Sequence, residues 1–308
     1  MGKVVTLLTE RTELRAWRPS DRDAFAALNA DPAVMEHFPS PLDRVQSDDF
    51  ADRISSGLEK RGWGLWAMEL PGRFEFVGFV GLNEPGFDVP VDLAETPPLE
   101  VGWRLGQAAW NQGLASEAAL EVLRFAFAEL GRREVVSFTT PGNDRSRRVM
   151  EKLGLHTDPR DDFDHPHMAE LGHDRVTRHV LYRIGAAEHA AQEHDTARRQ
   201  LRDHVGRFNL GVRSGDWSAM LRSLAPDAVF TAVGAAAGVL RVEGRDAIGV
   251  AYAADPPSDE IVVFDPVGDG DHGVVARWSD ACRPERVLGD LCLHAGPAGI
   301  TALAVTFD

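Results

Sequence analysis

The sequence predicts an α/β fold for its N-terminal part and a second, α+β unit behind it. From Leu14 to Ile184, strand-like apolar runs alternate with amphipathic helical segments. A length of 308 residues favours two domains over one. Beyond Gln200, helical segments come first and a run of strands follows, which is typical of an α+β domain.

Turn and capping residues delimit the expected elements of the N-terminal part. Ser20 can cap the first helix, and Pro71-Gly72 joins two aromatic and β-branched runs into a hairpin. Gly131 and Gly154 follow the two later helices, as C-terminal caps do. The expected strands are 13–17, 63–70, 75–82, 99–105, 134–139 and 178–184, and the expected helices are 21–29, 116–130 and 144–153.

A change of composition separates the two parts. Residues 186–200 are rich in Ala, Glu and His, which predicts a helical linker between domains at 1–185 and 201–308. The second domain opens with a helix from Leu201, a turn at 214–216 and a helix at 217–224. Its expected strands are 261–264, 273–278, 286–295 and 299–307.

Charge and cysteine content exclude several classes of partner. The net charge of −15 argues against nucleic acids and anionic membrane surfaces. The N-terminus lacks an apolar signal core, and the longest apolar run, Ala228–Leu240, is shorter than the ~20 residues of a membrane span. Cys282 and Cys292 match no metal motif. We therefore expect a soluble, cytoplasmic protein with no nucleic-acid or membrane partner.

A strand, a tight turn and a helix at residues 99–118 form the most informative segment. Gly113 and Ala115 allow a close approach to the backbone, and the helix is expected to begin at Ser116. The unpaired N–H groups at such a helix N-terminus hold a pyrophosphate well. An ordinary strand–turn–helix unit is the alternative on the turn alone.

Two blocks, the Gly113 turn and the segment Asn143–Gly154 behind the strand 134–139, resemble the GNAT superfamily of N-acetyltransferases. The similarity is strongest to the branch of ribosomal-protein N-terminal acetyltransferases (RimJ/RimL type). The segments 9–21, 31–37 and 179–183 also fit that branch, so that the resemblance covers roughly residues 8–185.

This resemblance implies a sheet splayed open between the strands 101–105 and 134–139, with acetyl-CoA in the gap. The exposed backbone of the first strand would pair with the pantetheine arm, the turn would take the pyrophosphate, and Asn143 would reach the pantetheine from the other side. The implied cofactor-binding residues are Trp103, Arg104, Leu105, Trp110, Gln112, Gly113, Leu114, Ala115, Ser116 and Asn143. Trp110 stands where the family usually has Gln or Arg, so backbone N–H groups would carry most of the pyrophosphate binding.

Acetyl transfer to an amine needs a proton acceptor for the amine and a proton donor for the departing thiolate. Glu100, which opens the splayed strand, is the first choice as acceptor, with a salt-bridged strand-edge carboxylate as the alternative. Relatives use a Tyr as donor where this chain has Met150, and Ser146 is the alternative donor. Ser146 is also compatible with a purely local role in the first turn of its helix.

Four further residues are expected near the amine. Glu36 and His37 lie in a loop that would cover it, and Phe163 and His165 belong to an Asp- and His-rich segment over 156–173. This segment lacks regular ligand spacing, so no metal is expected. The acceptor would be a small-molecule amine or a peptide N-terminus. No Cys lies in this half to carry an acyl group, which favours direct attack on the thioester.

The segments 208–230 and 244–248 resemble the nuclear-transport-factor-2-like superfamily, which includes ketosteroid isomerase and SnoaL-type cyclases. The resemblance implies a helical cone on a curved antiparallel sheet. Phe208 and Ala232 replace the isomerases' oxyanion-hole Tyr and general-base Asp, which favours a non-catalytic role as a homodimer contact or a wall of the acceptor pocket. The alternatives are a cyclase- or isomerase-type enzyme acting in this domain, and a non-catalytic acyl-CoA-binding module.

Overall fold

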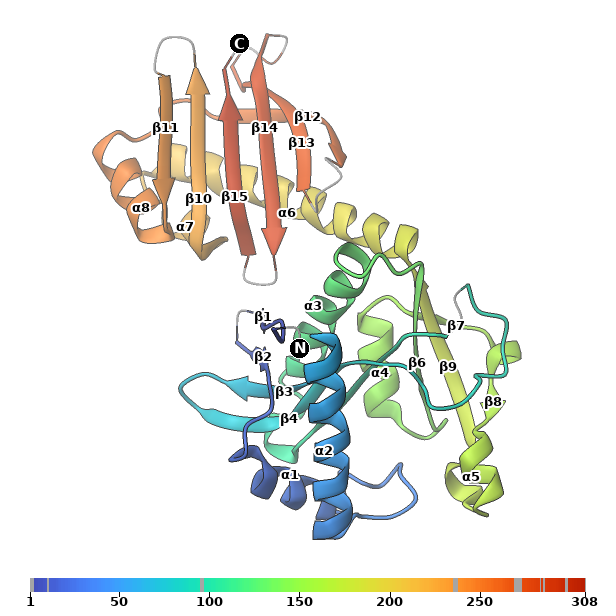
Figure 1. The fold of residues 1–308 in the computed structure, drawn as a ribbon. Helices are drawn as coiled ribbons and strands as arrows, with labels where there is room; N and C mark the ends of the chain where they lie inside the picture. Colours follow the sequence, from blue (N-terminus) through green and yellow to red (C-terminus); the bar gives the residue numbers. More distant parts are fainter. Residues whose placement is uncertain are drawn as a thin grey trace. The chain divides into compact units, whose positions relative to one another are not determined.

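The structure is a computed structural model that describes residues 3–9, 11–94, 97–234, 238–268, 273–282, 284, 286–296 and 299–307. The chain divides into two compact units, residues 1–186 and residues 187–308. In Figure 1 the first unit runs from blue to green and the second from yellow to red.

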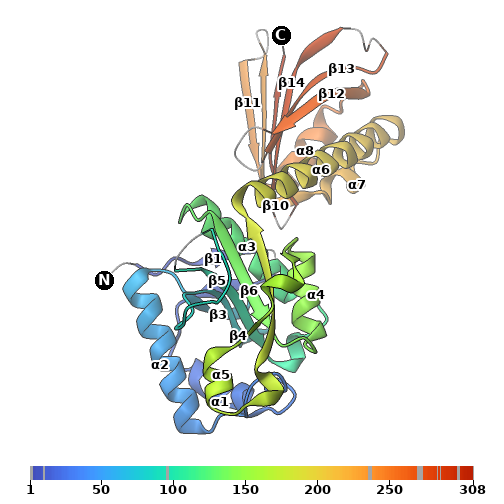
Figure 2. The ribbon, with the colours of Figure 1, turned by 90° about the vertical axis from the view of Figure 1, so that its right-hand side faces the viewer.

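A mixed sheet forms the centre of the first unit. Its order is β1-β2-β3-β4-β5-β6-β9-β7, with β8 paired to β9 outside this path. The strands are β1 (Leu7–Leu8), β2 (Glu13–Arg15), β3 (Leu65–Leu70), β4 (Phe74–Asn83), β5 (Glu100–Leu105), β6 (Glu134–Thr139), β7 (His156–Thr157), β8 (Phe163–Asp164) and β9 (Arg178–Gly185). The pair β5–β6 is parallel, whereas the other pairs of this sheet are antiparallel. β5 and β6 are neighbours in Figure 2.

Helices cover both faces of this sheet. They are α1 (Asp21–Ala30), α2 (Arg44–Arg61), α3 (Leu114–Ala128), α4 (Asp144–Lys152) and α5 (Pro166–Glu170). Val80 of β4 belongs to a core cluster with Leu123 of α3, while its neighbour Phe79 packs with Phe25 of α1 and Ile54 of α2. Since successive strand residues face opposite sides, α3 and the pair α1/α2 lie on opposite faces.

The structure corrects three expectations in this unit. α3 begins at Leu114, two residues before Ser116, because Gly113 caps it with a φ of 78°. Ser20 occupies the N-cap of α1 but makes no side-chain capping bond. The helix α2 was not expected, because its sequence is mostly polar. Its capping box, in which Asp43 and Gln46 exchange hydrogen bonds, was the available signal.

Where the structure describes it, the second unit contains a six-stranded sheet and three helices. The helices are α6 (Ala186–Ser214), α7 (Ser218–Leu221) and α8 (Arg245–Ala254), and the sheet order is β11-β10-β15-β14-β13-β12. The strands are β10 (Leu224–Gly234), β11 (Gly238–Glu243), β12 (Ile261–Gly268), β13 (Gly273–Asp280), β14 (Val287–Gly296) and β15 (Gly299–Thr306). Leu201, Phe208, Trp217, Val274 and Leu293 belong to its apolar core.

Three features of this unit differ from expectation. The sheet is mixed rather than antiparallel, because β10 and β15 run parallel. Residues 186–200 are the first half of α6, which continues to Ser214, so the expected linker and the first expected helix are one element. The strands β10 and β11 and the helix α8 were missed; glycines interrupt the apolar run that forms the two strands and obscure their alternation. The limits of the expected domains stay a prediction.

Along the described part of the chain, no helix combines the length and the apolar character needed to cross a membrane.

Candidate functional site

A cavity of about 510 Å³ lies where β5 and β6 separate. The two strands share one register pair, Glu100 with Val136, although β5 pairs with β4 along its whole length on the other side. Gly102, Trp103 and Arg104 of β5 face Ser137 and Thr139 of β6 across this gap, and all five line the cavity. The separation leaves backbone groups of β5 without a strand partner on the β6 side in the described ladder, so an extended ligand can pair there.

The turn before α3 forms one end of the cavity. Gly113 has a φ of 78°, a conformation that costs other L-residues about 1–2 kcal/mol. Leu114, Ala115 and Ser116 open the helix and line the cavity, so their N–H groups are among those that have no intrahelical partner. Gln112 is not part of the lining; its side-chain amide donates to the carbonyl of Ala108 at 2.6 Å.

Glu117 fastens this turn to the N-terminal segment. Its carboxylate accepts hydrogen bonds from the Thr9 hydroxyl at 2.6 Å and from the Arg11 backbone N–H at 2.9 Å. The Arg11 guanidinium pairs with it at 2.6 Å and also donates to the Gln112 carbonyl at 3.0 Å. A negative charge in the first turn of a helix interacts favourably with the helix dipole, so Glu117 stabilises the start of α3.

Three cations of α4 lie along the same cavity and were not anticipated as site residues. Arg145, Arg148 and Lys152 all line it, at spacings of three and four residues that place them on one helix face. Arg145 stacks over the ring of Trp110, with 4.1 Å between Cζ and the ring centroid. This spacing of the three cations is visible in the sequence. It places them on one face of the expected helix, and this could have indicated an anion-binding site.

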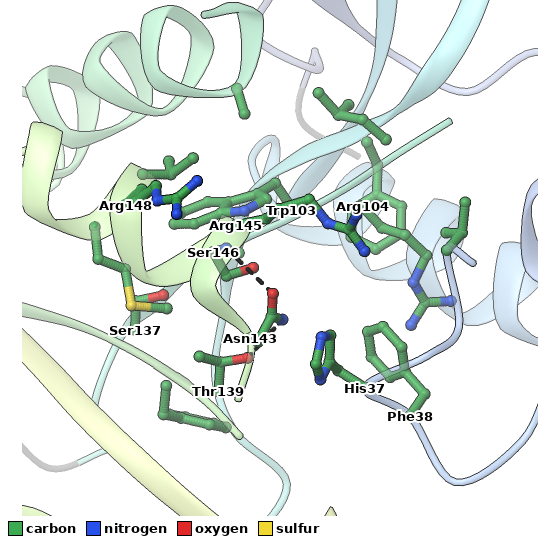
Figure 3. A pocket seen from close by; sticks show the side chains of 18 of the residues that line it. His37, Phe38, Trp103, Arg104, Ser137, Thr139, Asn143, Arg145, Ser146 and Arg148 are labelled. Atoms are coloured by element: carbon green, nitrogen blue, oxygen red, sulfur yellow. Dashed lines mark hydrogen bonds between the residues drawn. The ribbon is translucent and has the colours of Figure 1, made fainter. Parts of the chain in front are cut away.

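Asn143 and Ser146 lie between Arg148 and the pair His37 and Phe38 (Figure 3). Asn143 is the N-cap of α4: its side-chain oxygen accepts from the Ser146 N–H at 3.2 Å, and its side-chain amide donates to the Thr139 hydroxyl at 2.9 Å. Ser146 also lines the cavity. Met150, at the position of the relatives' Tyr, is buried and also reaches the lining.

Glu100 lines the cavity at the point where β5 and β6 last pair. The removal of its carboxyl group from water raises its pKa to about 7, and a hydrogen bond from Asn83 at 3.5 Å opposes this shift only in part. None of the ion pairs found among the described residues includes Glu100. A carboxyl group with a pKa near neutrality suits proton transfer at physiological pH.

Glu36 and His37 have different positions. His37 lines the cavity, its Nδ1 lies 3.0 Å from the Thr140 hydroxyl, and its pKa is lowered chiefly by burial and also by Arg145. Glu36 lies outside the lining; 59% of its side chain is exposed, and it pairs with Arg145 at 3.1 Å. Arg145 therefore connects the loop that carries Glu36 to Trp110 in the turn.

His165 lines the cavity and Phe163 does not. Phe163 is buried and stacks on His179, another lining residue, with ring centroids 5.7 Å apart. Burial, helped by the neighbouring His179 and His167, lowers the pKa of His165 to about 4, so its ring is neutral at physiological pH. Among the described residues, no group of three or more His, Cys, Asp or Glu side chains could hold a metal ion.

Comparisons with known proteins address the same part of the chain. The family profile described as "Acetyltransferase (GNAT) domain" matches residues 11–156. Protein YkkB of Bacillus subtilis (strain 168) is 29% identical over 51% of this chain and 88% of its own length. The FsC-acetyl coenzyme A-N(2)-transacetylase of Aspergillus fumigatus is 34% identical over 49% of this chain, which spans 64% of that relative. A GNAT-family acetyltransferase of known structure from Bacillus anthracis is 22% identical, covers 60% of this chain and all of its own, and has a TM-score of 0.49.

Proposed function

We propose that this chain is an N-acetyltransferase that transfers the acetyl group of acetyl-CoA to a primary amine, because residues 11–156 match the acetyltransferase domain of the GNAT family and curated relatives carry acetyltransferase names. The name of the relative from A. fumigatus includes acetyl coenzyme A, which supports this acetyl donor. The acceptor would be a small molecule or a protein N-terminus. The relative from A. fumigatus is named as an N(2)-transacetylase, which supports an amine as the acceptor.

One observation supports this proposal most directly: a single cavity contains the turn before α3, the free side of β5, and Glu100. The N–H groups at the start of α3 suit a pyrophosphate, and the free side of β5 suits an amide-bearing arm. Arg148 and Lys152 add positive charge in a protein whose net charge is −15. These are the recognition elements that the phosphates and pantetheine of acetyl-CoA need.

Acetyl-CoA supplies the acetyl group, and CoA leaves as the thiol. In the proposed reaction the amine nitrogen forms a bond to the thioester carbonyl carbon, and the carbon–sulfur bond breaks. Glu100 takes the proton that the amine loses, and the Ser146 hydroxyl gives a proton to the sulfur. Water then returns a proton to Ser146 and removes one from Glu100, so that proton transfer balances. Ser146 is close to Asn143, which holds the start of its helix.

Removing the two cations at once, by Arg148→Ala with Lys152→Ala, is expected to raise the Kd of acetyl-CoA about five- to thirtyfold, since exposed charge pairs contribute roughly 0.5–1 kcal/mol each. The loss should shrink at high salt, which screens such pairs. Calorimetric titration at low and high salt measures both effects. The matched control is Arg73→Ala with Arg160→Ala, which removes the same charge outside the cavity lining. An equal loss in the control would contradict a local contact.

The proposal is tested by titrating the full chain with acetyl-CoA in a calorimeter, with CoA as a comparison, and then following thiol release with a panel of amines. Micromolar binding followed by thiol release that depends on an added amine is expected. Binding without turnover across small amines and peptides would favour an acyl-CoA-binding module instead. Absence of binding would overturn the assignment of the cavity.

For the second unit we propose a nuclear-transport-factor-2-like fold with a non-catalytic role as a homodimer contact. Phe208 belongs to its apolar core and Ala232 lies in β10, which supports the view that neither supplies the polar group of the isomerases. The residues found to line the cavity above all lie between Ala33 and His179, so the first unit supplies the proposed chemistry. Cys282 is a free, exposed cysteine, which supports the cytoplasmic location that we propose.

A further inference from the structure

Glu100, Gly102 and Arg104 lie at every second position of β5, so their side chains belong to the same face of the sheet. All three residues line the cavity. The Cα atoms of the first and last are separated by four residues, about 13 Å in an extended strand. A Cβ built on Gly102 would meet only an oxygen of Glu100, at 3.8 Å, so this middle position is open. The strand therefore carries a carboxyl group and a guanidinium with free space between them.

Arg104 is buried, with 9% of its surface exposed, yet it has few polar partners. One of its terminal nitrogens donates to the side-chain oxygen of Asn29 at 2.6 Å. Its Nε has no hydrogen-bond partner in the described structure. No Asp or Glu among the described residues forms an ion pair with it, in contrast to Arg15, which is held by both Asp21 and Glu69.

Aromatic rings supply the rest of its surroundings. The Cζ of Arg104 lies 4.0 Å from the ring centroid of Phe38. Its distances to the ring centroids of Phe50 and Phe79 are 5.5 Å and 5.6 Å. Rings attract a guanidinium but do not neutralise its charge. Burial lowers the pKa of Arg104 to about 10, which leaves it charged at physiological pH. A buried cation without a counter-ion is costly, and an anion in the cavity would offset that cost.

We propose that Arg104 binds a carboxylate of the acceptor, and hence that the acceptor is an amine that also carries a carboxylate. This inference rests on the proposed acetyl transfer, because it places the amine at Glu100 and the carboxylate at the other end of the same strand face. The planar guanidinium offers paired N–H donors that match the two oxygens of a carboxylate. Phe38 and Phe79 also line the cavity and would exclude water from this ion pair.

The test compares ω-amino acids with their carboxamides. The probes are β-alanine, γ-aminobutyrate, δ-aminovalerate and ε-aminocaproate, each also as the neutral amide, with acetylation followed by thiol release. For at least one chain length, kcat/KM for the carboxylate should exceed that for its amide about tenfold or more, as a charge-assisted pair implies. In Arg104→Gln this ratio should fall to about one, and in Arg104→Lys it should be intermediate.

The ratio within each variant separates recognition from a merely structural role, because a general loss of folding or cofactor binding lowers both members of a pair equally. Circular dichroism and acetyl-CoA titration establish that each variant is folded and binds the cofactor. Equal use of carboxylates and amides by the unaltered protein overturns the inference but leaves acetyl transfer standing. If no probe is acetylated, calorimetry with the CoA-saturated protein decides: absence of binding by all four carboxylates overturns it. Failure to bind acetyl-CoA at all would instead refute the proposed function.

Discussion

Replacing Glu100 with glutamine is expected to lower kcat about 100- to 10,000-fold, the usual contribution of a general base. The amide keeps the size of the side chain and a polar partner for Asn83, so the Kd of acetyl-CoA should change by less than about twofold. Thiol-release kinetics and calorimetry measure the two quantities. Glu59→Gln is the matched control, because Glu59 is an exposed residue of α2 outside the cavity lining. Unchanged turnover in Glu100→Gln would remove Glu100 from the mechanism.

The pH profile of the same pair of proteins tests the raised pKa of Glu100, about 7. Below this pH both Glu100 and the acceptor amine must lose a proton, so log kcat/KM should rise with a slope of about two. Above it, only the amine still titrates, up to its pKa of about 8–10, and the slope should fall to about one. In Glu100→Gln the slope should be about one throughout. A wild-type profile without a break near pH 7 would contradict the assignment.

The same shift links activity to stability. The pKa of Glu100 is about 7 in the folded chain against 4.5 for the ordinary group, so the folded state holds a proton that the unfolded state releases. The contribution of this bound proton to the free energy of unfolding is complete below about pH 4.5, declines as the pH rises and is lost above about pH 7. Glu100→Gln should therefore raise the unfolding free energy by roughly 1–3 kcal/mol at pH values above 7 and by little in acid. Urea unfolding at two pH values measures this difference.

Replacing Gly113 with tryptophan is expected to weaken acetyl-CoA binding at least about 100-fold, because the indole would occupy the space next to the first N–H groups of α3. Calorimetric titration measures the loss. The substitution also strains the backbone, since Gly113 has a φ of 78°. Gly131→Trp is the matched control: Gly131 follows α3 and has a φ of 61°, and a Cβ added to it would meet no atom within 4 Å. If both variants lose binding alike, strain rather than the ligand site explains the effect.

The sequence predicted local features of the N-terminal unit well. The strand 134–139 is confirmed at both ends, and the turn at Gly113 and the helix behind it are where turn chemistry indicates. The start of α3 was misplaced by two residues, because the helical signal at Ser116 does not reveal that a glycine with positive φ can itself cap the helix. The first and last residues of a helix depend on the backbone dihedral angles of several neighbouring residues.

The parts of the site that could not be predicted depend on contacts between distant segments. The hydrogen bond between Arg104 and Asn29 spans 75 residues, and nothing in either neighbourhood indicates it. The resemblance assigned a role to the backbone of Arg104, whereas its side chain is the unusual feature. The burial that raises the pKa of Glu100 likewise arises from the packing of several elements, which no local pattern encodes. The cations of α4 were accessible in the sequence through their helical spacing.

The attachment of Glu117 to Thr9 and Arg11 joins segments that are more than 100 residues apart. Opening this attachment would release the first turn of α3, so a ligand bound to that turn resists the opening and stabilises the N-terminal segment as well. Hydrogen exchange of the Arg11 amide should therefore slow when acetyl-CoA binds, although Arg11 is absent from the cavity lining. The free energy of acetyl-CoA binding at this turn thus depends in part on the stability of the attachment between Glu117 and the N-terminal segment.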